Sequence, residues 1–238
     1  MLEESLRYPL ESDDSIATLL IGALLTVLSI LIIPAFIVQG YLVRVLRSSV
    51  AGETEAPSFT DWGDLFVDGL KLFLINLVFG IIVAIPFVIV TVVFLGGAFA
   101  AGDAGGGSGA AALGLLSLLL FAVVGLLALV LAYFLPAMFA NFAVEGRLGA
   151  AFDLSTVRAV AFTSEYFVAV LLGVVAGAVL NSVGGTLAFI LVGLPILFYG
   201  QVVTYYLFGR GYAEGRTASG LSPAPGSTAT TTDRSGGV

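Results

Sequence analysis

The sequence predicts an all-α protein: a polytopic integral membrane helical bundle of about five transmembrane helices with short interfacial helices. Of its 238 residues, 59% are apolar and only 11% are charged, whereas soluble domains average about 45–50% and about 25%. The mean hydropathy is +1.10. A soluble core of this size could not hide so much apolar surface. Four stretches carry no charge, and each exceeds the roughly 20 residues that cross a bilayer: residues 15–43, 72–102, 104–144 and 166–209.

Residues 1–14 are predicted to be an interfacial segment, with Tyr8 as an anchor at the membrane surface. The cluster Ser12-Asp13-Asp14-Ser15 supplies capping side chains for a first span over residues 15–43. The N-terminal segment is acidic, whereas a cleaved signal peptide begins with positive charge. We therefore expect the first span to be retained. A re-entrant segment that does not cross fully is the alternative.

The remaining uncharged stretches are divided by glycine. Residues 102–110 are glycine-rich and predict a flexible turn between the second and third spans. The last stretch would measure roughly 66 Å as one helix, so we expect a break at Gly184-Gly185. The transmembrane domain then covers residues 15–215, and the Ser/Thr/Gly/Pro-rich residues 216–238 are predicted to be a disordered tail. The predicted spans are residues 15–43, 72–95, 111–142, 166–183 and 186–208.

Residues 59–70 have an amphipathic pattern, which predicts an interfacial helix between the first and second spans. The apolar positions are Phe59, Trp62, Phe66 and Leu70, and the acidic ones are Asp61, Asp64 and Asp68. Trp62 is expected at headgroup depth. Three carboxylates could bind a divalent cation, but a solvated acidic face with Asp68 near Lys71 is favoured. We predict no metal site.

The distribution of Lys and Arg predicts the orientation, because cytoplasmic loops carry an excess of both. Five spans with the N-terminus outside and the C-terminus in the cytoplasm leave only Arg7 on the outer side. The eight inner bases are Arg44, Arg47, Lys71, Arg147, Arg158, Arg210, Arg216 and Arg234. We therefore predict a multi-pass protein of the cell membrane with a cytoplasmic C-terminus.

A similar short sequence pattern, proline followed by phenylalanine and then arginine, occurs three times along the chain. Pro34-Ala-Phe36 precedes Arg44, Pro136-Ala-Met-Phe139 precedes Arg147, and Pro195-Ile-Leu-Phe198 precedes Arg210. One interpretation is a parallel repeat, as found in transporters. The other is shared chemistry at the membrane border, where arginine is expected in any case.

The absence of Cys and His excludes disulfides, thiol nucleophiles, imidazole bases and Cys/His metal sites. The net charge of −7 provides no basic surface for nucleic acid. We predict no catalytic residue, no cofactor and no enzymatic activity. The predicted partners are the lipid bilayer and either a second copy of the chain or another membrane protein.

Two sets of residues within the spans are candidates for helix contacts. The first is a stripe of mostly small residues: Ala169, Gly173, Gly177, Asn181 and Gly185. Such a stripe lets helix backbones approach closely in lipid, either within the chain, which is favoured, or between two copies. The second is a polar set, Gln39, Asn141 and Gln201, each five or six positions after a proline. These residues could meet as an inner cluster, although separate interhelical hydrogen bonds are favoured.

Several segments occur in order along residues 5–215 and together carry a family resemblance. They include Tyr8-Pro9, Pro34-Ala-Phe36, Gly40-Tyr41, residues 59–71, residues 141–147, Ala151-Phe152-Asp153 and residues 206–214. This set resembles the domain of unknown function 4013 family of polytopic membrane proteins. The resemblance implies a haloarchaeal membrane protein and implies no activity, catalytic residue or cofactor.

These observations predict a non-enzymatic structural, scaffold or accessory component of the membrane. The alternative is a small permease or lipid-handling protein for uncharged or amphipathic substrates, suggested by the repeated pattern and the polar set. Ionisable residues inside spans usually mark proton relays, and none is required by this assignment of spans, which disfavours a proton-driven pump.

Overall fold

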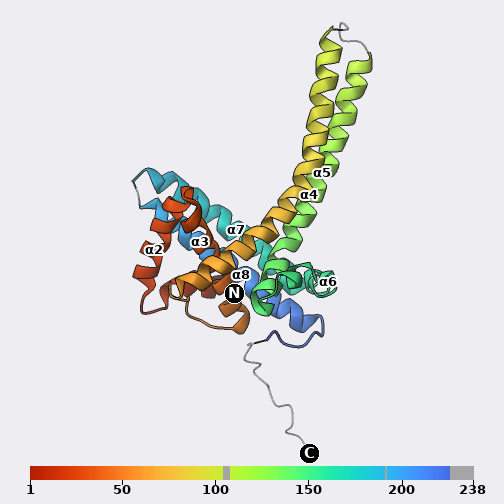
Figure 1. The fold of residues 1–238 in the computed structure, drawn as a ribbon. Helices are drawn as coiled ribbons and strands as arrows, with labels where there is room; N and C mark the ends of the chain where they lie inside the picture. The colour runs from red at the N-terminus through yellow and green to blue at the C-terminus, as the bar shows by residue number, and fades with distance from the viewer. Residues whose placement is uncertain (104–107, 191, 226–238) are drawn as a thin grey trace, which may run out of the picture. The chain divides into compact units, whose positions relative to one another are not determined.

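The computed structural model describes residues 1–103, 108–190 and 192–225 (Figure 1). All regular secondary structure in this part of the chain is helical. The predicted all-α class is therefore confirmed for the described residues. The chain divides into two compact units. Unit 1 comprises Met1–Phe73 and Phe134–Val238, and unit 2 comprises Leu74–Tyr133.

The N-terminal part of unit 1 is a bent helical hairpin. Its elements are α1 (Leu2–Arg7), η1 (Tyr8–Leu10), α2 (Ser15–Val27), η2 (Leu28–Ile30) and α3 (Ile32–Ala51). Leu31 is extended, with φ −87° and ψ 127°, so residues 15–43 do not form one continuous helix. The span predicted over these residues stays a prediction. Pro34 explains the new helix start. It is the third residue of α3, where a missing N–H leaves no helical hydrogen bond unmade.

The long helices α4 (Trp62–Asp103) and α5 (Ser108–Glu145) belong to both units. Residues 62–70, predicted as most of a separate interfacial helix, are the first turns of α4. No residue with a helix-ending conformation divides them from the apolar part. Within unit 2, α4 and α5 lie side by side (Figure 1), and the Phe121 ring contacts Phe87 and Phe94.

The remaining elements of unit 1 are η3 (Leu148–Phe152), α6 (Leu154–Ala161), α7 (Ser164–Leu187), η4 (Ala188–Ile190) and α8 (Gly193–Ala218). The predicted break at Gly184-Gly185 is wrong, because both glycines lie inside α7. The helix ends a few residues later, and Pro195 is the third residue of α8. The hairpins α2–α3 and α7–α8 are therefore built alike: a helix, a 3-10 turn, and a return helix with proline in its first turn.

Helix α8 is the centre of unit 1. Every residue from Gly193 to Arg216 is buried or half-buried, because α8 packs along α7 and also against α3, α2, α6 and α1. A cluster of aromatic and aliphatic side chains fills the space between α8 and the N-terminal hairpin. Its largest members are Tyr8, Tyr41, Phe59, Phe198 and Tyr206.

The end of α8 also corrects the predicted tail. The helix continues to Ala218, and Arg216 Nε donates a 2.7 Å hydrogen bond to the carbonyl oxygen of Ser222. The boundary at residue 216 therefore lies too early in the chain. Residues 226–238, the rest of the predicted tail, are outside the described residues, as are residues 104–107 of the predicted turn.

Three helical segments of the described chain are long and apolar enough to cross a membrane: Trp62–Phe99, Ala112–Glu145 and Ser164–Leu187. A bent pair, Leu2–Leu10 with Ser15–Ile30, passes the same test jointly and turns by 90° at its break. Helix α8, predicted as a span over residues 186–208, is not among them. Three or four candidate spans suggest membrane association, and both the polytopic arrangement and the number five stay predictions.

Candidate functional site

The closest helix contact of unit 1 joins α3 to the first turns of α4 through two glycines. A Cβ atom at Gly40 would lie 1.7 Å from the carbonyl oxygen of Leu65, and one at Gly69 would lie 1.8 Å from that of Phe36. Neither position has room for any side chain, because real Cβ contacts do not fall below 3.0 Å. The two backbones therefore cross in direct contact, which glycine alone permits.

Arg47 holds three helices together beside this crossing. From α3, its Nε donates to the Ala143 carbonyl oxygen in α5 at 2.9 Å, and its Nη2 lies 3.1 Å from Asp68 Oδ2 in α4. Lys71 Nζ lies 3.2 Å from the other oxygen of Asp68, so the predicted proximity of Asp68 and Lys71 is observed. The guanidinium also satisfies one of the last carbonyl groups of α5, which have no partner within the helix.

The three acids of the predicted interfacial helix are placed differently from one another. Asp61 precedes α4 in the left-handed region, with φ +51°, and its side chain and that of Asp64 are exposed. Asp68 is half-buried and ion-paired. In the described ranges, no group of three His, Cys, Asp or Glu residues could hold a metal ion.

The four apolar positions predicted for this segment differ in exposure, since Phe59 is buried and Phe66 is half-buried. Their location at the membrane interface stays a prediction. Trp62 is 45% exposed and Leu70 is exposed, whereas Leu65, Leu72 and Ile75 are buried. The buried positions are those that follow the glycine crossing along one face of α4. Trp62 keeps one aromatic neighbour, Phe59, with ring centroids 6.0 Å apart.

Asn141 is the buried polar centre of unit 1. Its Nδ2 donates to the Ala150 carbonyl oxygen at 2.8 Å, and its Oδ1 accepts a 2.7 Å hydrogen bond from Tyr212 OH. Tyr212 OH in turn accepts from Arg216 Nη1 at 2.9 Å. The network joins α5, η3 and α8, so the amide satisfies its hydrogen bonds at a junction of helices rather than at an open surface.

The other two members of the predicted polar set lie elsewhere. Gln39 is half-buried on α3, and Gln201 is half-buried on α8. Across the described ranges, no hydrogen bond connects either side chain to Asn141. The reason is that Asn141 faces η3 at Ala150 and α8 at Tyr212, and its hydrogen bonds are used there.

Only part of the predicted stripe on α7 packs against another helix. Ala169 would contact a Cβ at Gly211, and a Cβ at Gly173 or Gly177 would meet Phe208 or Thr204. These three residues therefore pack against α8 of the same chain. Asn181 is exposed, and a Cβ at Gly185 would meet nothing within 4 Å. Gly184 lies against α8 instead, and a Cβ atom there would lie 2.9 Å from the Leu197 side chain.

Helix α6 begins with a side-chain cap. Asp153 accepts hydrogen bonds from the backbone N–H groups of Ser155 and Thr156 and from both hydroxyls. The hydrogen bond from the Ser155 hydroxyl, followed by that from Thr156, lowers the pKa of Asp153. The capping residue is thus Asp153, and Ser155 supplies a donor to it.

The N-terminal segment is fixed to the ends of α3 and α8. Tyr8 OH and Ser48 Oγ are 2.5 Å apart, the Tyr8 and Tyr206 ring centroids are 4.3 Å apart, and Tyr199 OH donates to the Leu6 carbonyl oxygen. Burial raises the pKa of Tyr8, so its phenol is a neutral hydrogen-bonding group. Residues 8 and 48, which flank the α2–α3 hairpin, therefore lie at the same end of it.

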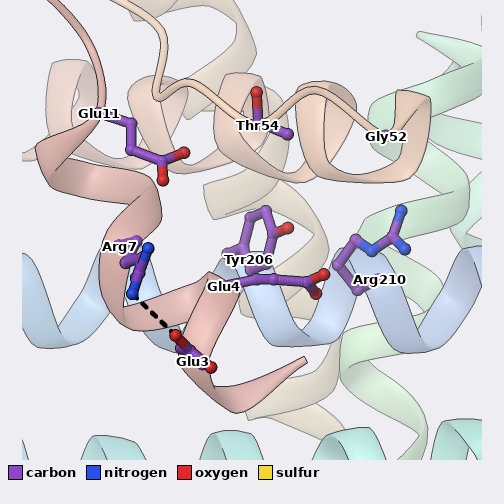
Figure 2. A pocket seen from close by; sticks show the side chains of 8 residues that line it. All are labelled: Glu3, Glu4, Arg7, Glu11, Gly52, Thr54, Tyr206 and Arg210. Carbon is purple, nitrogen blue, oxygen red and sulfur yellow. Dashed lines mark ion pairs between the residues drawn. The ribbon is translucent and has the colours of Figure 1, made fainter.

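A polar hollow of about 340 Å³ lies beside this junction. Figure 2 shows its lining from three parts of unit 1: Glu3, Glu4, Arg7, Glu11, Gly52, Thr54, Tyr206 and Arg210. Four of its charges are already paired: Arg7 Nη2 lies 2.8 Å from Glu3 Oε1, and Glu4 Oε2 lies 3.0 Å from the N-terminal amine. Arg210 Nη2 lies 3.5 Å from Glu214 in the next turn of α8. The hollow offers charged groups, and no nucleophile beside a general base lines it.

Sequence reasoning missed the two most constrained features, the Gly40–Gly69 crossing and the Arg47 junction. A weak signal for the first exists, because Gly40 lies near the end of an uncharged stretch and Gly69 lies inside a segment with a helical pattern, where glycine is unfavourable. No local signal exists for the second. Arg47 and Ala143 are separated by 96 positions, and a main-chain acceptor leaves no trace in the residue type.

Comparison with known proteins identifies one relationship. A family model described as "Protein of unknown function (DUF4013)" matches residues 27–189. No curated protein matches the chain, and no solved structure does. The match begins at the last residue of α2 and ends in the turn after α7, and it covers more than half of the sequence. The chain therefore belongs to the DUF4013 family.

Proposed function

We propose that this protein is a multi-pass component of the cell membrane with a structural or accessory role and no enzymatic activity. The observation that carries the proposal is where the polar and the apolar side chains lie. The strongest polar groups of unit 1 join helices to one another, as Arg47 and Asn141 do, and apolar side chains cover the outside. A surface of this kind is suited to lipid and to other apolar helices.

The outward-facing apolar side chains support the membrane setting. In unit 1, Phe167, Leu171 and Val175 of α7 are exposed, and in unit 2 so are Ile85, Val92 and Leu118. Asp103 is the one charged residue that the sequence places between positions 74 and 133. Exposed apolar patches much beyond a few hundred Å² are rare on soluble monomers, whereas lipid accommodates them.

The orientation and the source belong to the same proposal. Arg210 and Arg216 lie in the second half of α8, and Arg158 lies in α6. The positive-inside rule therefore favours a cytoplasmic position for α6 and for the end of α8. The polar fraction is acidic and contains a single lysine, Lys71, which is consistent with the high-salt cytoplasm of a haloarchaeon.

The proposal is tested by purification and reconstitution of the full chain. We expect a defined homo-oligomer or a stoichiometric complex with another membrane protein, measured by single-molecule photobleaching in native-membrane nanodiscs. We also expect no flux above empty vesicles for a panel of small solutes and fluorescent lipids. A lone monomer that transports would overturn the proposal and favour a permease or lipid-handling protein. In that case a Gln201→Leu variant should lose the flux, because Gln201 belongs to the polar set predicted for a path.

A further inference from the structure

We propose that the α2–α3 hairpin is a re-entrant wedge. In this arrangement residues 15–43 enter the bilayer from the side of Arg44 and Arg47, turn at Leu31 among the acyl chains of that leaflet, and leave on the same side. The inference rests on the membrane setting of the proposed function and adds where the N-terminal segment lies. It replaces the external N-terminus predicted from the sequence.

The lengths of the two legs are too short for a crossing. Helix α2 has 13 residues and η2 has 3, which together rise about 24 Å at 1.5 Å per residue. The apolar part of α3, from Ile32 to Val43, rises about 18 Å. The hydrocarbon core is about 30 Å thick, so each leg ends within it.

The tip of the hairpin has the chemistry of a surface in contact with hydrocarbon. Ile30 is 90% exposed and Ile32 is 71% exposed, and Leu31 and Ile33 are exposed beside them. A turn in water would be expected to carry polar side chains. The polar groups near this turn bond within their own helix, since Thr26 donates to the Gly22 carbonyl oxygen and Ser29 to that of Leu25. Backbone and hydroxyl groups must be satisfied internally in this way where water is absent.

The base of the hairpin is closed and polar. Tyr8 and Ser48 form a hydrogen bond across it, so the chain enters and leaves at one end. The α1–η1 segment turns by 90° from α2, and its Leu2, Leu6 and Leu10 side chains are exposed. A short helix with exposed leucines at right angles to an inserted helix is the geometry expected at the membrane interface.

The contact between α2 and α8 fixes the hairpin in this position. A Cβ atom at Gly22 would lie 2.2 Å from the Phe198 ring, so the ring of α8 occupies the space beside the middle of α2. The wedge is thus held against the central helix of unit 1. It is not a free arm on the surface of the protein.

The charge distribution is more uniform with a wedge than with a crossing. If residues 15–43 do not cross, then α4 leaves the inner side, α5 returns, and α7 and α8 repeat the excursion. Arg7 then lies on the inner side with the other eight bases, so that all nine are cytoplasmic. The acids of residues 1–14 are no obstacle, because Asp and Glu contribute little to topology.

Single-cysteine variants test this inference directly, because the chain has no cysteine of its own. Glu11→Cys and Glu53→Cys flank the wedge, Ile30→Cys marks its tip, and Asp103→Cys marks the end of α4. Sealed vesicles of both orientations are treated with a membrane-impermeant maleimide. We expect Glu11→Cys and Glu53→Cys to label from the same side and Asp103→Cys from the other. Ile30→Cys should be protected on both sides.

A depth measurement completes the test. With an environment-sensitive fluorophore on Ile30→Cys, lipids that carry a quencher near the bilayer centre should quench more strongly than lipids with a headgroup quencher. The Ile30 side chain is almost fully exposed, so this variant should fold, and Ile32→Cys provides a second tip position. Labelling of the two flanking cysteines from opposite sides would overturn the wedge and leave the structural role intact. Release of the protein by alkaline carbonate would instead overturn the membrane proposal itself.

Discussion

The substitution Gly40→Ala is a direct test of the backbone contact between α3 and α4. The new Cβ would lie 1.7 Å from the Leu65 carbonyl oxygen, whereas a close carbon–oxygen contact in a helix pair measures about 3.3 Å. The helices would therefore have to separate by about 1.6 Å locally. The neighbour is backbone, so no side-chain rotation can relieve the overlap.

The magnitude follows from two opposing effects. Overpacking of a well-packed contact costs up to about 3 kcal/mol, while replacing a helical glycine by alanine returns about 1 kcal/mol of helix propensity. The matched control is Gly80→Ala, a helical glycine of α4 where a Cβ meets nothing within 4 Å. Because the propensity gain is common to both variants, their free energies of unfolding should differ by about 3 kcal/mol.

Thermal unfolding in detergent measures this difference. For a chain of this size, about 3 kcal/mol corresponds to a separation of roughly 6–12 °C in Tm. The single tryptophan, Trp62, begins α4 and reports on the crossing by its fluorescence. Gly69→Ala should behave as Gly40→Ala does, since its Cβ would lie 1.8 Å from the Phe36 carbonyl oxygen. If Gly40→Ala and Gly80→Ala unfold within about 2 °C of each other, the direct backbone contact is refuted.

Three further predictions concern polar contacts of unit 1. Arg47→Lys should lower Tm, because Lys lacks the planar donor pair that reaches Ala143 and α4 together; an unchanged Tm would contradict this. Tyr212→Phe leaves the buried Asn141 Oδ1 without its donor, which should cost about 1–3 kcal/mol in chemical unfolding. A double variant that also changes Asn141 should cost less than the sum of the single changes. Asp153→Ala should cost about 1 kcal/mol, measured by Tm at neutral pH. The folded-state pKa of Asp153 is below its ordinary 3.8, so the cap is complete above that pH and is lost as the pH falls through the folded value. The Asp153→Ala difference should therefore vanish in strong acid.

Hydropathy alone predicted the helical class and the long apolar helices of unit 2. The uncharged runs leave few places where α4 or α5 could end. Few residues of unit 2 are buried, so its helices depend little on tertiary packing. The first hairpin could not be predicted in the same way. Residues 28–33 are apolar apart from Ser29, so nothing in their composition marks a break. The hairpin packs against a helix far along the chain, where the Phe198 ring of α8 lies beside Gly22.

Gly184-Gly185 illustrates a competition between two meanings of glycine. As a pair between apolar runs, it indicates a break. In a helix that packs against another helix, a glycine instead allows close approach, and Gly184 serves that contact with Leu197. The proline that follows was the better marker of the boundary, because its ring fits only the first turn of the next helix. Pro34 and Pro195 mark their return helices in this way, whereas Pro136 lies inside α5.

The central position of α8 has a consequence for biosynthesis. Helices α1, α2, α3, α6 and α7 all pack on residues of α8, yet α8 is the last of the described helices to be translated. Gly22, Ser49 and Asn141 must therefore wait for partners on α8 that are translated long after them. A ribosome stalled before Gly193 would hold a set of inserted helices without the element that joins them. Assembly of unit 1 should accordingly be a late, nearly post-translational event.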